Sequence, residues 1–221
     1  MKKAFEVVFN DEYVLVVNKK TKILVCPSPK KEKYTLTSLL EKDLKIRVFP
    51  CHRLDRETTG LIMYAKDKEI HKEIIKEFQK REIEKKYIGF VKGRLEKKKA
   101  ILEGFILDRE GKRFGEKPKK AQTLYKVLEE FEGFSVVEMI PLTGRTNQLR
   151  IQFARVGHPI LGERKYARGK DFPIKFRRLA LHVYFLSFIH PISKERVKLK
   201  IDLPQDMKKF LNDYIVKLLN C

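Results

Sequence analysis

The residues best suited to chemistry in this chain are concentrated in one stretch, which reads CHRLDRETTGLIMYAK over residues 51–66. His52, Arg53 and Asp55 lie within four residues of one another, and Gly60 can let the backbone pass close to another segment. The apolar run that follows predicts a buried strand, and polar loops held by a rigid strand often carry catalytic groups. An ionised carboxylate such as Asp55 can act as a nucleophile or help to abstract a proton. A solvated turn with a local ion pair would produce the same pattern.

The charge of the chain points to a polyanionic partner. The 221 residues include 50 Lys and Arg against 29 Asp and Glu, a net charge of +21. Charged residues make up 36% of the chain, compared with about 25% in an ordinary domain. This excess excludes an acidic, solvating protein and indicates RNA, DNA or an anionic membrane surface as the partner.

The apolar pattern argues against a membrane. The longest apolar run, residues 179–189, is interrupted by His182 and is too short to span a bilayer. The first residues, MKKAFE, lack the apolar stretch of a signal peptide, so we expect a cytoplasmic protein. Cys26, Cys51 and Cys221 lie far apart without CxxC spacing, which predicts neither a disulfide framework nor a metal site.

The elements that must position residues 51–66 follow an α+β pattern. Runs of β-branched and aromatic residues predict strands over 6–9 and 14–18 (a hairpin), 61–65, 87–93, 134–140, 178–191 and 196–201. Apolar residues at helical spacing predict helices over 68–81, from about 146 to 157, and from about 204 onward. Residues 30–34 and 108–120 are predicted to be loops. We therefore expect a single domain over residues 1–221, with a mixed, largely antiparallel β-sheet flanked by helices and loops.

Residues 52–66 resemble the signature of the RluA family of RNA pseudouridine synthases, HRLD-x-x-T/S-G-L/V. Further blocks resemble elements of the same family in the same order: VLVVNK (14–19), EKKY (84–87), VKG (91–93), LTGRTNQLR (142–150), GHPILG (157–162) and LALH (179–182). The chain begins almost directly with sequence that resembles the catalytic core. We therefore expect the compact form, without the N-terminal S4 domain of many relatives or another accessory domain.

The resemblance implies that the protein isomerises uridine to pseudouridine in large-subunit ribosomal RNA, in transfer RNA, or in both. The glycosidic C–N bond breaks, the base turns, and a C–C bond forms. Substrate and product contain the same atoms, so no redox cofactor or energy source is required, and the family needs no metal.

The resemblance also assigns roles at the reaction site. Asp55 matches the catalytic aspartate, which attacks a sugar carbon or helps to abstract a sugar proton. Arg150 matches the basic residue that pairs with this aspartate, and a guanidinium can hold a carboxylate in a two-point fork. Tyr87 matches a tyrosine that can stack on the uracil and transfer a proton. Leu54 and Ile151 are expected to line the base pocket.

RNA contacts are expected around this site. Arg53 can enter the helix stack where the target base has flipped out. The other expected RNA-binding residues are His52, Thr59, Arg145, Asn147, Arg164, Lys165, Arg168 and Lys170. The last four belong to a basic cluster, residues 164–178, that also includes Lys175, Arg177 and Arg178 and is interleaved with Tyr166, Phe172 and Phe176. A second basic cluster spans residues 112–120. Phosphate contacts there would position a stem-loop without reading its sequence. The alternative role for His52 is that of a hydrogen-bonded structural histidine.

Two departures from the family pattern bear on the site. Asn147 stands where the family usually has histidine, and an amide can form hydrogen bonds but cannot titrate near neutral pH. This favours a structural or RNA-facing role for Asn147. Lys20 stands where proline is usual, so the turn after residue 19 is less constrained.

Two other functions fit parts of the sequence. A catalytically inactive RNA-binding module on the same fold is one, although Asp55, Tyr87 and Arg150 are all present. The other is a nucleoside or glycoside hydrolase, which breaks the same kind of bond. Such an enzyme typically needs a second carboxylate flanking the bond, and Glu57 would face elsewhere along an extended loop. We expect a monomer, because no apolar stripe remains unexplained.

Overall fold

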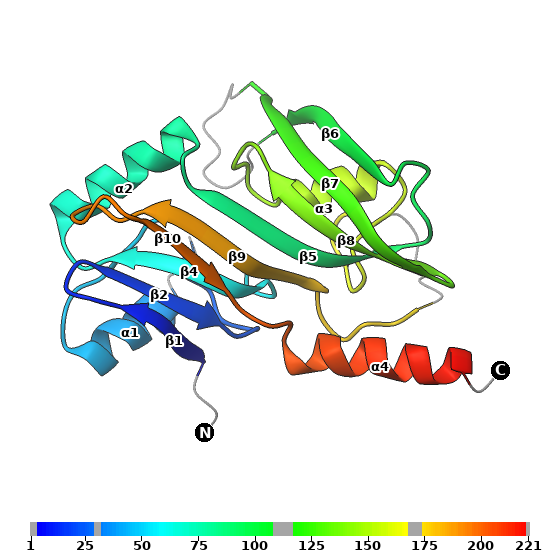
Figure 1. The fold of residues 1–221 in the computed structure, drawn as a ribbon, viewed down its shortest axis with the longest axis horizontal. Helices are drawn as coiled ribbons and strands as arrows, with labels where there is room; N and C mark the ends of the chain where they lie inside the picture. The colour runs from blue at the N-terminus through cyan, green and yellow to red at the C-terminus, as the bar shows by residue number, and fades with distance from the viewer. Residues whose placement is uncertain (1–3, 29–31, 108–116, 168–173, 220–221) are drawn as a thin grey trace.

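A computed structural model describes residues 4–28, 32–107, 117–167 and 174–219, and it shows a ten-stranded sheet flanked by helices (Figure 1). The helices are α1 (Leu36–Leu44), α2 (Lys68–Lys80), α3 (Gln148–Arg155) and α4 (Gln205–Leu219). The strands are β1 (Phe5–Asn10), β2 (Val14–Lys19), β3 (Phe49–Pro50), β4 (Thr59–Ala65), β5 (Glu84–Lys92), β6 (Lys99–Ile106), β7 (Lys119–Phe131), β8 (Phe134–Pro141), β9 (Leu181–Ile189) and β10 (Arg196–Lys200). In the described part of the chain, no helix is long and apolar enough to cross a membrane.

The sheet is mixed and largely antiparallel, as expected. Its main path runs β1-β2-β4-β9-β5-β8-β7-β6, with β10 paired to β9 and β3 paired to β4. The pair formed by β4 and β9 is parallel and joins Thr59 to His182 and Gly60 to Val183. The other pairs are antiparallel. The loop that carries Asp55 therefore ends at the point where the two parallel strands meet.

Gly60 makes this parallel contact possible. Its φ is +113°, and a Cβ atom at this position would lie 2.2 Å from the carbonyl oxygen of Val183. Side chains rarely adopt such a φ, and no Cβ fits so close to backbone. The expectation that Gly60 lets the backbone pass close to another segment is confirmed.

Helix α2 shows how local sequence sets the element bounds. Asp67 caps its N-terminus by accepting hydrogen bonds from the N–H groups of Glu69 (2.7 Å) and Ile70 (3.3 Å). Arg81 ends the helix in a left-handed conformation. Ile70 and Ile74 are buried, so the apolar face packs into the core as the helical spacing predicts.

Helix α4 packs on the sheet through aromatic residues. Phe210 and Tyr214 lie 5.3 and 4.8 Å from Phe134, measured between ring centroids. Phe176 joins the same group, 5.2 Å from Phe210. Phe210 and Tyr214 thus pack against the core, as expected for apolar residues at helical spacing, whereas the neighbouring Ile215 is 40% exposed.

Several boundaries differ from the predictions. The helix expected from about residue 146 begins at Gln148, and the strand expected from residue 178 begins at Leu181. Lys119 and Lys120 belong to β7 rather than to a loop, while residues 108–116 lie outside the described residues. Helix α1 and strands β3, β6 and β7 were not predicted.

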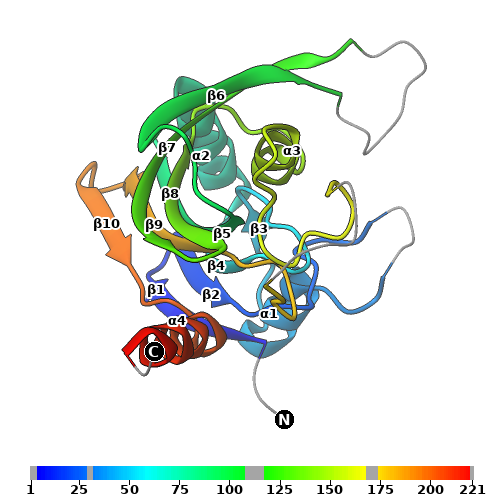
Figure 2. The same cartoon turned by 90° about the vertical axis from the view of Figure 1, so that its right-hand side faces the viewer.

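The β6–β7 hairpin curves over α3 and fixes that helix (Figure 2). Gln152 donates hydrogen bonds to the carbonyl oxygens of Leu102 (2.9 Å) and Ala121 (3.1 Å). Arg155 donates to the carbonyl oxygen of Phe105 (2.7 Å). Gln152 lies two positions after Arg150, and residues two positions apart point to different sides of a helix. Because Gln152 is directed at the hairpin, Arg150 is directed away from it.

Candidate active site

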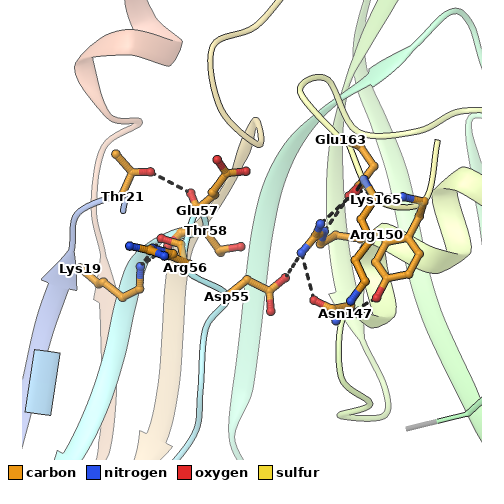
Figure 3. A network of polar contacts seen from close by, with 11 residues as sticks. Lys19, Thr21, Asp55, Arg56, Glu57, Thr58, Asn147, Arg150, Glu163 and Lys165 are labelled. Atoms are coloured by element: carbon orange, nitrogen blue, oxygen red, sulfur yellow. Dashed lines mark hydrogen bonds and ion pairs between the residues drawn. The ribbon is translucent and has the colours of Figure 1, made fainter. Parts of the chain in front are cut away.

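The centre of the site is an ion pair between Asp55 and Arg150 (Figure 3). Nη1 of Arg150 lies 3.2 Å from Oδ2 of Asp55, and the two side chains are 16% and 29% exposed. Asp55 comes from the loop before β4, and Arg150 comes from α3, 95 positions later in the chain. The two residues therefore meet only in the folded protein. The contact is a single point rather than the expected two-point fork.

The guanidinium fork of Arg150 is instead directed at Glu163. Nε and Nη2 of Arg150 lie 2.6 and 2.9 Å from the two carboxylate oxygens of Glu163, whose side chain is fully buried. Burial alone would lower the pKa of Arg150, but the carboxylates of Glu163 and Asp55 raise it above its ordinary value. Burial would raise the pKa of Glu163, but Arg150 and two backbone N–H groups lower it. Both groups therefore remain charged.

Asn147 and Tyr166 complete the surroundings of Arg150. The side-chain oxygen of Asn147 accepts a hydrogen bond from Nη1 of Arg150 (3.0 Å), and its amide nitrogen donates to the hydroxyl of Tyr166 (3.0 Å). The Tyr166 ring centroid lies 5.2 Å from the guanidinium carbon. These contacts give Asn147 a structural role, which is one of the two roles that its amide favoured.

Tyr87 lies in the same electrostatic environment. It is on β5 at a bulge opposite β9, and it is 8% exposed. Burial raises the pKa of its hydroxyl well above the ordinary value of 10.0, and the negative charge of Asp55 raises it further. The hydroxyl therefore stays protonated at neutral pH and can donate a hydrogen bond, and it is a weaker acid than a free phenol.

Lys19 anchors the loop that carries Asp55. It is fully buried at the end of β2, and its Nζ donates to the carbonyl oxygens of Thr58 (2.7 Å), Lys20 (3.0 Å) and Arg56 (3.3 Å). Burial lowers its pKa to about 7, although the charge of Asp55 acts in the opposite direction. Figure 3 shows Lys19 directed at this loop.

Two further side chains bind the carbonyl oxygen of Glu57, in the same loop. The hydroxyl of Thr21 donates at 3.4 Å and Nη1 of Arg178 at 3.5 Å. Arg178 is 5% exposed and forms a two-point ion pair with Asp206 (2.6 and 2.8 Å). Groups from two distant parts of the chain, residues 19–21 and Arg178, thus hold the backbone just after Asp55.

Lys19 and Glu163 are members of the site that were not predicted from the sequence. Lys19 carried a signal, because it is a charged residue at the end of the apolar run VLVVN. Glu163 carried none, since a single acidic residue next to two basic residues is typical of a solvated surface turn.

Arg53, Leu54 and Ile151 flank the ion pair. Leu54 is 7% exposed and packs in the core beneath the loop, whereas Arg53 is exposed. Ile151 is half-buried on α3, next to Arg150. The structure places all three beside the residues that the resemblance assigned to catalysis.

Two of the expected RNA contacts are wrong for this structure. Nε2 of His52 accepts the N–H of Met63 (3.1 Å), and burial lowers the pKa of His52 well below its ordinary value. The structural alternative therefore holds for His52. Thr59 is 4% exposed, and its hydroxyl lies 2.9 Å from Nδ1 of His182 inside the sheet, out of reach of a bound RNA.

The basic cluster at residues 164–178 divides into an exposed part and a packed part. Arg164, Lys165, Lys175 and Arg177 are exposed. Arg178 and Phe176 instead pack inside the protein, which corrects the expectation that they belong to the surface. Arg145 is half-buried and donates to the carbonyl oxygen of Lys120 (3.1 Å). Arg168, Lys170 and Phe172 lie outside the described residues. Lys112 and Arg113 of the 112–120 cluster also lie outside them, whereas its other basic residues, Lys117, Lys119 and Lys120, are exposed.

The arrangement supports reactions of a carboxylate beside a protonated phenol. Asp55 is held by a charge-assisted hydrogen bond on a loop whose backbone is anchored, and Tyr87 supplies a proton donor nearby. Among the residues that the structure describes, no group of three or more His, Cys, Asp or Glu side chains could hold a metal ion.

Comparisons with known proteins agree with this chemistry. The sequence profile of the RNA pseudouridylate synthase family matches residues 13–155. A tRNA pseudouridine synthase C from Vibrio parahaemolyticus is 33% identical over 222 residues, covering 90% of each chain. A dual-specificity RNA pseudouridine synthase RluA from Pasteurella multocida is 35% identical over 196 residues, covering 86% of this chain and 89% of the relative. The solved structure of human RNA pseudouridylate synthase domain containing 4 shares the fold, with a TM-score of 0.76 at 24% identity and coverage of 93% and 91%.

Proposed function

Because this chain belongs to the RNA pseudouridylate synthase family and is an RNA pseudouridine synthase, we propose that Asp55 is its catalytic carboxylate. Arg150 is the ion-pair partner of Asp55, and Tyr87 stacks on the target uracil and transfers a proton. The observation that carries this proposal is the 3.2 Å contact between Asp55 and Arg150. It joins two segments that each resemble a family motif and that lie 95 positions apart.

The proposed reaction is balanced without a cofactor. The carboxylate of Asp55 attacks a sugar carbon or helps to abstract a sugar proton while the bond from C1′ to N1 of uracil breaks. The base turns, and a bond forms between C1′ and C5. N1 gains a hydrogen, and C5 loses one. Tyr87 relays a proton in these steps, and its protonated hydroxyl supports this role.

The substrate is RNA, and its details belong to the proposal. One relative is named for transfer RNA, and another is named as dual-specificity. We expect a flipped uridine in a stem-loop of transfer RNA, of large-subunit ribosomal RNA, or of both, bound by a monomer in the cytoplasm. Arg53 is exposed beside Asp55 and would fill the gap left by the flipped base. Arg164, Lys165 and the other exposed members of their cluster would contact phosphates.

Pseudouridine mapping tests the assignment of Asp55. Total RNA would be mapped at single-nucleotide resolution from cells with and without the gene. Sites lost with the gene should return with the wild-type protein but not with Asp55→Asn. Purified Asp55→Asn should still bind an unmodified transcript of a mapped site with a Kd within about threefold of wild type.

Asp202→Asn is the matched control, because it makes the same change at an exposed carboxylate paired with Lys208. It should restore every site. Sites restored by Asp55→Asn would refute the assignment. Free uracil released by the wild-type protein would indicate a hydrolase instead.

A further inference from the structure

We propose that Glu163 is a positioning residue that directs Nη1 of Arg150 at Asp55. The proposal rests on the proposed role of the Asp55–Arg150 pair and extends it to a residue that touches neither Asp55 nor, in the reaction above, the substrate. It accounts for the contact of the arginine fork with Glu163 rather than with Asp55.

The three nitrogens of the Arg150 guanidinium are divided among different partners. Nε and Nη2 of Arg150 both bind Glu163, at 2.6 and 2.9 Å. Nη1 binds Asp55 at 3.2 Å and the side-chain oxygen of Asn147 at 3.0 Å. A guanidinium is planar and rigid, so two nitrogens held by one carboxylate fix the direction of the third. Glu163 therefore sets where the positive end of Arg150 lies relative to Asp55.

Glu163 is itself fixed to the backbone. One of its carboxylate oxygens accepts the N–H groups of Lys165 (2.7 Å) and Tyr166 (3.1 Å). Gly162, just before it, has a φ of +81°, and a Cβ there would lie 1.8 Å from the carbonyl oxygen of Arg178. This close approach locks the segment against the residues that lead into β9. The carboxylate of Glu163 is therefore a fixed point from which the guanidinium can be oriented.

Two further contacts restrict motion of the guanidinium out of its own plane. The ring of Tyr166 lies against it at 5.2 Å, and Asn147 bridges the Tyr166 hydroxyl and Nη1 of Arg150. These contacts restrict rocking, whereas the two bonds to Glu163 restrict rotation within the plane. Loss of Glu163 should therefore leave Arg150 beside Asp55 but with less defined geometry.

Glu163→Gln is the direct test. A glutamine offers one acceptor and one donor, so it cannot accept both Nε and Nη2 of Arg150. We expect the single-turnover rate of pseudouridine formation to fall by about 10- to 100-fold, because small misplacements of catalytic groups have effects of this size. The Kd for an unmodified RNA substrate should stay within about threefold of wild type. A merely structural role would not separate the rate from the Kd in this way.

Glu163→Asp and Glu138→Gln are the companion variants. The aspartate retains the charge with a shorter reach, so its rate should lie between those of wild type and Glu163→Gln. If Glu163→Gln proves too unstable to purify, Glu163→Asp carries the test by the same comparison of rate with Kd. Glu138 is a half-buried carboxylate on β8 that accepts a hydrogen bond from Tyr184, and Glu138→Gln should leave the rate unchanged.

A double-variant cycle separates positioning from an independent effect. Lysine at position 150 has no fork, so Glu163 has no plane to orient in an Arg150→Lys background. Adding Glu163→Gln to that background should lower the rate by less than about threefold. An unchanged rate in purified Glu163→Gln would overturn the proposal, and so would an unchanged rate in Glu163→Asp where that variant carries the test. The proposal would also be overturned if Glu163→Gln lowered the rate in the Arg150→Lys background by the same factor as in the wild type. Activity in Asp55→Asn would refute the proposed function instead.

Discussion

Replacing Lys19 by methionine should remove a specific pH dependence from the stability of the protein. Lys19 is fully buried, and its pKa is about 7 in the folded state against an ordinary value of 10.5. Between these two values the unfolded chain holds a proton that the folded protein has released. The free energy of unfolding of the wild type therefore rises with pH across this window, and the destabilisation from burying a charged lysine is complete below pH 7.

The size of the effect follows from the same shift. Each pKa unit corresponds to about 1.4 kcal/mol, so this site contributes a slope of up to about 1.4 kcal/mol per pH unit above pH 7. Over the full window the contribution is on the order of 5 kcal/mol. Methionine has no such titration. It also removes the hydrogen bonds to the loop carbonyls, but that loss shifts the stability curve without giving it the same slope.

Urea denaturation at pH 7, 8 and 9 measures this difference. The stability of wild type minus that of Lys19→Met should increase by about 1 to 1.4 kcal/mol per pH unit. Lys20→Met, at the exposed neighbouring position, is the matched control and should follow the wild-type curve. Parallel curves for wild type and Lys19→Met would refute the idea that Lys19 is buried with a strongly lowered pKa.

Three further changes test other parts of the molecule. Tyr87→Phe keeps the ring but removes the hydroxyl, so the single-turnover rate should fall by about 10²- to 10⁴-fold with RNA binding retained. A rate near wild type would mean that Tyr87 acts through its ring and not through proton transfer. Arg164→Glu combined with Lys165→Glu should weaken RNA binding and reduce the slope of log Kd against log salt, whereas an unchanged slope in a filter-binding titration would exclude this patch. Gly60→Ala places a Cβ 2.2 Å from the carbonyl oxygen of Val183 at a φ of +113°. It should destabilise the fold by about 2 to 4 kcal/mol and lower the Tm in thermal denaturation. A Tm equal to that of wild type would contradict this expectation.

Sequence patterns predicted the elements whose residues follow one simple period. The run at 61–65 is uniformly apolar and lies within β4, which is buried along its whole length, and the spacing at 68–81 matches α2 to within one residue. Strand β7 was missed because its charged residues obscure the alternation: Lys126 and Glu129 face solvent, while Ala121 and Tyr125 are buried. Helix α1 is only nine residues long, and it is defined by a capping box between Thr35 and Ser38 rather than by a long apolar stripe.

The site was predicted where it follows linear motifs and was missed where it depends on tertiary contacts. The pairing of Asp55 with Arg150 followed from two motif matches. The choice of Glu163 as the partner of the fork depends on a turn near the start of β9, and no local pattern encodes that choice. The expectation for Thr59 failed for a related reason, because a hydroxyl next to the catalytic loop points into the sheet toward His182.

The parallel contact between β4 and β9 also determines when the site can form during folding. It joins residues 123 positions apart, and the Asp55–Arg150 pair spans 95 positions. Closing loops of this length costs conformational entropy before any contact compensates for it, so such pairings form late. A growing chain can complete its amino-terminal hairpin and α2 while Asp55 still lacks Arg150 and the loop after it still lacks Arg178. The ability to modify RNA should therefore appear in one late step, once the strand that begins at Leu181 has docked against Gly60.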